Sequence, residues 1–154
     1  MNTQKLKIIT DGSIIAIANT KKYNETLSNQ TNWTWRQFNN FILETNKDNL
    51  IVFDTSWENE WTVEFLINIE TDKAYFRKFE QSIEVTDQKL YLINWTDLTS
   101  SLQFKDTKLP DEINKEIKSY IENGYYKDVI KQILKTKDYE YEAENKINFI
   151  VELF

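Results

Sequence analysis

Histidine and cysteine are both absent from this 154-residue sequence. Without an imidazole or a thiolate, the chain cannot form a Ser-His-Asp triad, a Cys-His pair or an ordinary zinc site. Its two glycines cannot build a phosphate-binding loop, because such loops need several glycines at fixed spacing. Paired carboxylates are the main catalytic chemistry left. We therefore expect a protein that binds a partner and is not an enzyme.

Long apolar runs are missing as well. No stretch reaches the length of about 18 apolar residues that a membrane-spanning helix needs. The apolar run near the N-terminus is interrupted by Asp11 and Gly12, and no small-residue cleavage site follows it, so a secretory signal is not expected. Because glycine and proline are too scarce for a disordered chain, we expect one folded, β-rich domain over residues 1–154, located in the cytoplasm.

Basic residues are outnumbered by acidic ones, which gives a net charge of −6 and a pI near 4.8. Binding to nucleic acid or to an anionic membrane is disfavoured, because both require clustered lysine and arginine. An acidic surface suits a basic partner, although acidity can also serve solubility alone. No cofactor and no metal site is predicted.

Aromatic residues make up 14% of the chain, and together with isoleucine and leucine they favour strands. An Asp-Gly pair between apolar runs at 6–10 and 13–18 predicts a β-hairpin. The succession of strands predicts a mainly β fold, an antiparallel β-sandwich with one or two short helices. Further strands are expected within residues 49–57, 60–70, 74–95 and 147–154, and a short turn or helix followed by a strand within 95–110.

Helical periodicity is found in two places. In residues 32–45, apolar side chains recur at spacings of three and four, which predicts an amphipathic helix capped by Asn32 or Thr34. In residues 111–123, apolar side chains share one helical face and acids occupy the first turn, which predicts a second helix. The pattern of residues 125–135 fits either a helix or a strand.

Acidic and aromatic residues are interspersed in two segments. The first is DTSWENEW, residues 54–61, where Trp57, Glu58, Glu60 and Trp61 place carboxylates beside large aromatic surfaces. Tryptophan supplies apolar area at protein interfaces, and glutamate can pair with lysine or arginine there. Three interpretations stay open: a turn between two strands with one of the tryptophans in the core, a partner-binding surface, or a site that stacks sugars on the tryptophans.

The second segment is DYEYEAEN, residues 138–145. If it is extended, its acids project from one face and its tyrosines from the other. A row of negative charges of this kind resembles a polynucleotide and can meet a basic groove, although a solvated loop is the simpler interpretation. The residues predicted to bind a partner are Asp138, Tyr139, Glu140, Tyr141 and Glu142, together with the four residues of the first segment named above.

Several motifs follow one another between Trp33 and the C-terminus: Trp33-Thr34, LIVF, EFLI, RKFEQSIEVTDQKLYLINW, QFKDTKLP and NGYY. Their order resembles the competence-operon nuclease-inhibitor family, also called competence protein J, whose members inhibit a partner DNA-entry nuclease. The resemblance implies an inhibitor without catalytic residues, and its Gly-x-Tyr element implies that residues 125–133 form a strand. One departure is that residues 111–123 separate the proline from this element, whereas in the family the two lie close together.

The acidic charge, the two acidic-aromatic segments and the resemblance together predict an immunity or inhibitor protein. Its partner would be a basic nuclease or nuclease toxin domain, because a nuclease must carry positive potential to hold phosphates. The alternative prediction is a carbohydrate-binding or carbohydrate-active β-sandwich that uses Trp57 and Trp61.

Overall fold

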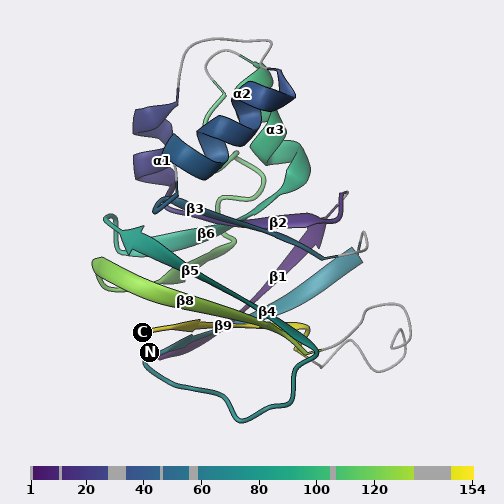
Figure 1. Ribbon diagram of the computed structural model, residues 1–154, viewed down its shortest axis with the longest axis vertical. Helices are drawn as coiled ribbons and strands as arrows, with labels where there is room; N and C mark the ends of the chain where they lie inside the picture. The colour runs from purple at the N-terminus through teal and green to yellow at the C-terminus, as the bar shows by residue number, and fades with distance from the viewer. Residues whose placement is uncertain are drawn as a thin grey trace.

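The computed structural model describes residues 2–10, 12–27, 34–45, 47–55, 59–104, 107–133 and 147–154. Two β-sheets lie face to face, and helices cover the outer side of one of them (Figure 1). The predicted mainly β fold is confirmed. The described residues contain three short α-helices, where one or two were expected.

The larger sheet has five strands in the order β1-β4-β9-β8-β5. These strands are β1 (Thr3–Thr10), β4 (Asn59–Ile67), β9 (Phe149–Leu153), β8 (Gly124–Gln132) and β5 (Arg77–Val85). Neighbours run antiparallel except β4 and β9, which pair in parallel. The sheet is therefore mixed and not purely antiparallel, because the C-terminal strand inserts between β4 and β8.

The smaller sheet has the order β3-β2-β6-β7, and its outer face carries the helices. Buried side chains such as Tyr23, Phe41 and Leu98 join those helices to the sheet. The strands are β3 (Leu50–Asp54), β2 (Ile14–Ala18), β6 (Lys89–Asn94) and β7 (Lys118–Tyr120). The helices are α1 (Thr20–Thr26), α2 (Trp35–Asn40) with its π-helical continuation η1 (Phe41–Thr45), and α3 (Trp95–Gln103).

The main hydrophobic core fills the space between the two sheets. Alternate residues of each strand point into it, as the period of two in a β-strand requires. The larger sheet contributes three fully buried aromatic residues, and the smaller sheet contributes mainly aliphatic ones. Members of this core include Trp61, Phe65 and Phe149 from the larger sheet and Ile15, Ile51 and Leu92 from the smaller.

The hairpin predicted at Asp11-Gly12 is wrong. β1 pairs with β4 in the larger sheet, whereas β2 pairs with β3 and β6 in the smaller one. The chain changes sheets here because Ile8 and Ile15 enter the core from opposite sides. Gly12 is needed for close packing, since a Cβ atom there would lie 3.0 Å from the Trp95 side chain.

The helix predicted over residues 111–123 is also wrong. Turns occupy residues 112–116, and β7 follows by pairing with β6. Ile113 is 88% exposed, whereas Ile121 is buried in the core, so tertiary pairing overrides the local helical pattern. Residues 107–110 form no strand either. In contrast, the strand implied for residues 125–133 is confirmed by β8.

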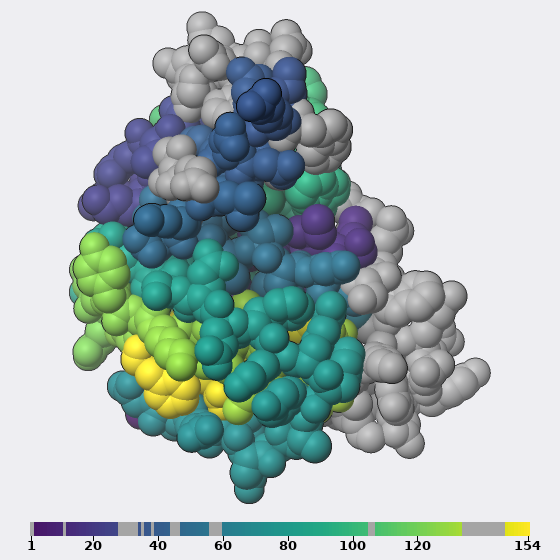
Figure 2. Space-filling model, viewed as in Figure 1, coloured from purple at the N-terminus to yellow at the C-terminus, as the bar shows by residue number. Residues whose placement is uncertain are grey.

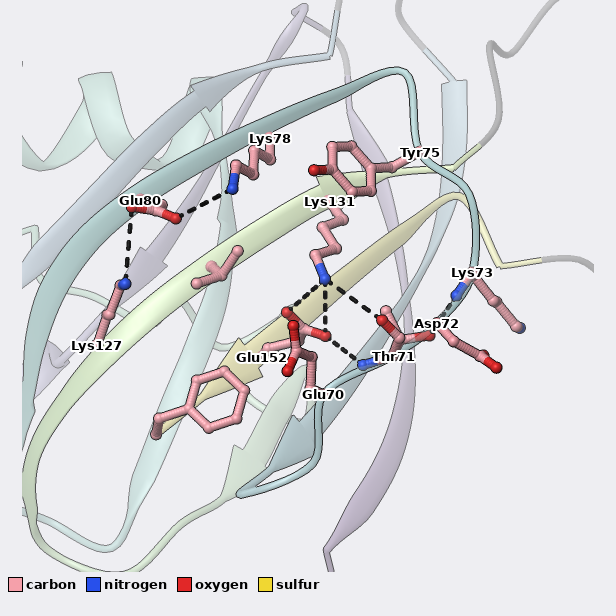
Figure 3. A pocket seen from close by; sticks show the side chains of 12 residues that line it. Glu70, Thr71, Asp72, Lys73, Tyr75, Lys78, Glu80, Lys127, Lys131 and Glu152 are labelled. Atoms are coloured by element: carbon pink, nitrogen blue, oxygen red, sulfur yellow. Dashed lines mark hydrogen bonds and ion pairs between the residues drawn. The ribbon is translucent and has the colours of Figure 1, made fainter.

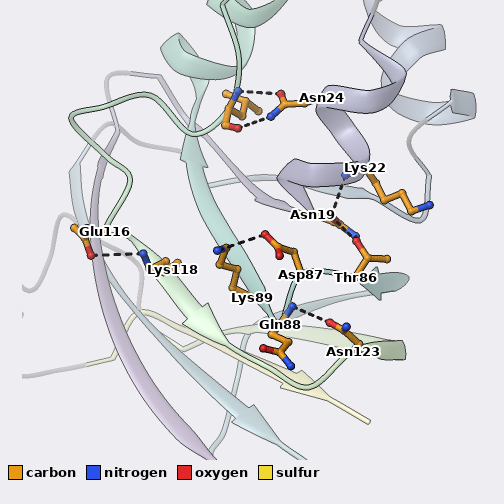
Figure 4. A network of polar contacts seen from close by, with 11 residues as sticks. Asn19, Lys22, Asn24, Thr86, Asp87, Gln88, Lys89, Glu116, Lys118 and Asn123 are labelled. Carbon is orange, nitrogen blue, oxygen red and sulfur yellow. Dashed lines mark hydrogen bonds and ion pairs between the residues drawn. The ribbon is translucent and has the colours of Figure 1, made fainter.

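Two asparagine side chains attach the polar helix α1, which the sequence pattern did not predict, to the rest of the fold (Figure 4). Asn19 caps the helix by accepting from the Lys22 amide at 3.1 Å and donates to the Glu84 carbonyl at 2.8 Å. Asn24 makes two bonds to the Leu109 backbone, at 2.6 and 3.1 Å. The predicted cap at Thr34 is confirmed for α2, because Thr34 and Gln37 exchange a reciprocal pair of bonds.

Candidate partner-binding end of the sandwich

The two predicted acidic-aromatic segments lie largely outside the described residues, but the chain ends that flank them are placed. The first segment begins at Asp54, the last residue of β3, and runs into β4. The second follows β8 and ends before Ile147. The residues outside the described ranges are Trp57, Glu58, Asp138, Tyr139, Glu140, Tyr141 and Glu142.

Arg77, the first residue of β5, ties together the ends of β3 and β8. Its guanidinium donates one hydrogen bond to the backbone carbonyl of Asp54 and another to the side-chain oxygen of Gln132. The same guanidinium carbon lies 5.0 Å from the centre of the Phe79 ring. Asp54, where the first segment begins, and Gln132, the last residue of β8, are therefore held by one side chain, although β3 and β8 belong to different sheets.

Asn148 makes the equivalent connection where the segments rejoin the sheet. Its side-chain oxygen accepts from the Thr62 amide at 2.9 Å, and its own amide donates to the Thr62 carbonyl at 2.9 Å. Its carbonyl accepts from the Ile133 amide at 2.8 Å. With only 4% of Asn148 exposed, these bonds are protected from water. All four flanking chain ends thus meet at one end of the sandwich.

Two of the predicted contact residues in the first segment lie within the described ranges, and they differ in exposure to solvent. Glu60 is exposed and lies 3.9 Å from the Lys7 ammonium, an ion pair worth little at the surface. Trp61 is fully buried, and its indole N–H donates to the Thr10 hydroxyl at 3.1 Å. The prediction that Trp61 binds a partner is therefore wrong, because its ring packs edge-on against Phe149 in the core. Its burial also removes one of the two stacking platforms of the carbohydrate alternative.

A buried ion pair lies on the outer face of the larger sheet (Figure 3). The Lys131 ammonium is 2.9 Å from Glu152, and their side chains are only 8% and 1% exposed. Sequence reasoning missed both residues, as it missed Arg77. The sequence did carry a signal for Lys131 and Glu152. Each is a charged residue within an apolar, strand-forming run, where charges are found only when they are paired.

The residues between β4 and β5, 68–76, border a crevice of about 550 Å³ whose other walls come from β5, β8 and β9. In Figure 2 the C-terminal end of the chain that follows β9, in yellow, reaches the surface between β8 and the teal residues of this region. The crevice lining includes Glu70, Asp72, Tyr75, Lys131, Glu152 and Phe154.

One carboxyl group lies inside the core. Asp128 is 1% exposed, between Tyr126 and Ile130 on the inner face of β8. Neither of its carboxyl oxygens has a hydrogen-bond partner among the described residues. Burial raises the pKa of this carboxyl well above its usual value, so it is held as the neutral acid over a wider range of pH.

The described ranges hold neither a membrane-spanning helix nor a cluster of metal-binding side chains. No helix in them has both the length and the apolar character to span a membrane. No group of three or more carboxylates gathers there in a metal-binding arrangement.

No protein-family model matches this sequence, and no curated protein does. Solved structures with the same fold include crocagin biosynthetic gene J, which is 12% identical, with 100% of this chain and 98% of that chain covered and a TM-score of 0.57. They also include ComJ of Bacillus subtilis, an inhibitor of the DNA-degrading activity of NucA. ComJ is 13% identical, with 99% of this chain and 94% of ComJ covered and a TM-score of 0.55. The fold implied by the motif order is therefore confirmed.

Proposed function

We propose that this protein binds a basic nuclease or nuclease toxin domain and blocks its substrate cleft, without catalysing a reaction itself. The observation that carries the proposal is the full-length likeness in fold to ComJ, an inhibitor of a DNA-degrading protein. The charge of −6 agrees with such a role, because an acidic protein is steered toward the positive cleft of a nuclease and competes there with DNA.

The proposed contact surface is the end of the sandwich at which the two acidic-aromatic segments begin and rejoin the sheets. Arg77 and Asn148 hold the flanking chain ends together, so acids and aromatics from both segments would reach one partner. Affinity would come from the aromatic anchors, and the acids would speed association and select the partner. The proposed contact residues are Trp57, Glu58, Glu60, Asp138, Tyr139, Glu140, Tyr141 and Glu142.

The test is a triple reversal, Asp138→Lys, Glu140→Lys and Glu142→Lys. The partner to assay is a nuclease encoded beside the gene, with DNA cleavage and calorimetric binding as readouts. We expect the wild-type protein to inhibit cleavage and the triple variant to bind at least about tenfold more weakly, since paired charges at interfaces are commonly worth more than 1.4 kcal/mol.

A matched control separates local contacts from overall charge. Asp87, Glu112 and Glu116 are exposed acids paired with neighbouring lysines at 3.0–3.6 Å, and reversing them changes the net charge by the same amount. The control should bind nearly as well as the wild type at physiological salt. Equal weakening by both variants would mean that only net charge matters and that residues 138–142 are not a contact.

A further inference from the structure

β3 and β5 are the end strands of their sheets, and they lie side by side at one edge of the sandwich (Figure 1). Because they belong to different sheets, discrete contacts join them in place of a strand ladder. At one end of this edge the Glu84 amide donates to the Asp48 carbonyl at 2.7 Å, and at the other end the Arg77 guanidinium donates to the Asp54 carbonyl. The edge is therefore closed by individual hydrogen bonds.

The middle of the edge is joined by one side chain, and its two hydrogen bonds are called the Gln81 bridge. Gln81 Nε2 donates to the Lys47 carbonyl at 3.0 Å and to the Leu50 carbonyl at 3.3 Å. Since Leu50 is the first residue of β3, the bridge ties the start of that strand to the middle of β5. The Gln81 side chain is exposed at the rim, so it can rotate without displacing core residues.

The buried acid Asp128 lies directly opposite Gln81 in the pairing of β8 with β5. Side chains in opposite positions of an antiparallel pair have Cβ atoms about 5 Å apart. Both point to the inner face, because Ile83 and Ile130, two positions away on the same strands, are in the core. Asp128 is 1% exposed, and neither of its carboxyl oxygens has a partner among the described residues. One rotation of the Gln81 side chain thus brings a donor to an acid that has none.

Neutral side chains surround Asp128 on this face. Leu153 lies opposite it on β9, and the core residues of the smaller sheet are aliphatic or aromatic. Tyr126 is titratable and on the same face of β8, but its hydroxyl already donates to the Glu122 carbonyl at 2.7 Å. The buried Ser119 hydroxyl is on β7, which meets β1 at the opposite edge of the sandwich. Gln81 is therefore the donor that the strand register offers.

Charged groups lie around this face and not on it. The Arg77 guanidinium, at the start of β5, is already bound to the Asp54 carbonyl and to Gln132. In the turn before β3, Lys47 is exposed and Asp48 is half-exposed. The side chains of Lys127 and Lys131 line the outer crevice. An ionised Asp128 has no cation among these groups to pair with, so a neutral donor must stabilise its charge.

We propose that the protonation of Asp128 controls the Gln81 bridge. While the carboxyl is protonated, Gln81 joins β5 to the Lys47 and Leu50 carbonyls. When the carboxyl loses its proton to solvent, the Gln81 amide turns inward and donates to the carboxylate, which leaves both carbonyls to water and loosens the edge between β3 and β5. Hydrogen bonds to a carboxylate are stronger than those to a peptide carbonyl, so this exchange offsets part of the cost of ionisation.

The direction of the pH dependence follows from burial, which raises the pKa of the Asp128 carboxyl. The bridged form persists above the pH at which an ordinary aspartate ionises, and the open form appears as pH rises through the folded-state pKa. Asp54 ends β3 and begins the first acidic-aromatic segment. A looser β3 adds an ordering cost to binding through that segment, so partner affinity should fall as pH rises. This link to a partner rests on the proposed function.

The first experiment is an NMR titration from about pH 4 to about pH 9, which needs no nuclease. It follows the side-chain carboxyl carbon of Asp128 and the side-chain amide of Gln81. In the wild type the two signals should change with a common midpoint, and in Asp128→Asn the Gln81 amide should stay constant. Gln81→Met should raise the Asp128 midpoint by about half a pH unit or more, because the carboxylate loses its donor.

The matched control is Gln103→Met, which alters an exposed glutamine on α3 and should leave the Asp128 midpoint unchanged. Three results would each overturn the proposal. They are a Gln81 amide that does not follow Asp128, an Asp128 carboxyl that does not titrate while the protein is folded, and an unchanged midpoint in Gln81→Met.

The second experiment measures affinity for the nuclease used above by calorimetry at the two ends of the titration range over which the protein stays folded. From low to high pH, the wild type should lose about threefold or more in affinity relative to Asp128→Asn. The exposed control Asp87→Asn should keep the wild-type pH dependence. Equal pH dependence in the wild type and Asp128→Asn would overturn the control of partner binding while leaving the proposed function intact. A wild type whose Gln81 amide follows Asp128 but which inhibits no nuclease would refute the proposed function alone.

Discussion

Replacement of Asp128 by asparagine tests whether the core holds an uncharged carboxylic acid. The two side chains have nearly the same shape, so the change removes the titration without creating a cavity. Asp128 is buried between the sheets with no partner for either oxygen among the described residues, and burial raises the pKa of its carboxyl. Ionisation inside the core is therefore unfavourable.

The sign of the effect follows from where the proton is held. The folded-state pKa lies above the unfolded-state value of about 3.9, so the folded protein keeps a proton that the unfolded chain releases. The stability that depends on this proton is fully present below the unfolded-state pKa. It is lost as pH rises toward the folded-state pKa, at about 1.4 kcal/mol per pH unit.

Urea unfolding followed by tryptophan fluorescence at pH 5, 6, 7 and 8 measures this loss. The absence of histidine and cysteine makes the window clean, because no side chain with an ordinary pKa between pH 6 and 9 is present. We expect the wild type to lose stability relative to Asp128→Asn as pH rises. The exposed control Asp87→Asn should give a constant difference. A constant difference for Asp128→Asn as well would refute the reasoning.

Two further predictions concern buried polar contacts. Asn19→Ala should lower the free energy of unfolding by about 2–4 kcal/mol, because it removes the cap of α1 and the donor to the Glu84 carbonyl. Urea unfolding measures this loss beside that of Thr34→Ala, which removes an exposed cap worth about 1 kcal/mol. Equal losses for the two variants would contradict the prediction. Lys131→Met should lower the free energy of unfolding by about 3–5 kcal/mol by leaving Glu152 buried without a cation, whereas Lys131→Met with Glu152→Leu should leave it nearly unchanged. A double-mutant cycle measures the coupling between the two side chains, and additive losses would contradict the prediction.

Strand positions were predictable because alternation is a local property, whereas strand partners were not. The apolar runs of β1 and β2 are separated by Asp-Gly, a strong local hairpin signal, yet each strand buries its inner face from a different sheet. The position of β9 in parallel beside β4 depends on a register between residues 63–67 and 149–153, which no local pattern encodes. Residues 111–123 show a different error. Their apolar spacing does fit a helix, but the pairing of β7 with β6 stabilises the fold more than a helix at these residues would.

The candidate site, too, was predictable in its local features and not in its long-range contacts. Composition and motif order predicted an acidic, aromatic binding protein, and they marked the segments 54–61 and 138–145 from sequence alone. The chain ends that flank these segments lie at one end of the sandwich because of Arg77 and Asn148, whose contacts join chain positions far apart in the sequence. Trp61 was misassigned because an aromatic residue beside acids looks the same in sequence whether its strand turns it inward or outward.

Strand parity explains why Asp128 has no cationic partner among the described residues, although Lys127 is its neighbour in the chain. On β8 the side chains of Lys127, Val129 and Lys131 point to the outer face, where they line the crevice, and those of Tyr126 and Ile130 point to the core. Because successive side chains alternate, Asp128 must face inward with the apolar set. Lys131 can reach Glu152 on the outer face of β9, but no rotamer of either lysine brings its ammonium through the sheet. Geometry therefore keeps both Lys127 and Lys131 away from this buried acid, and the asparagine variant measures the cost of that arrangement.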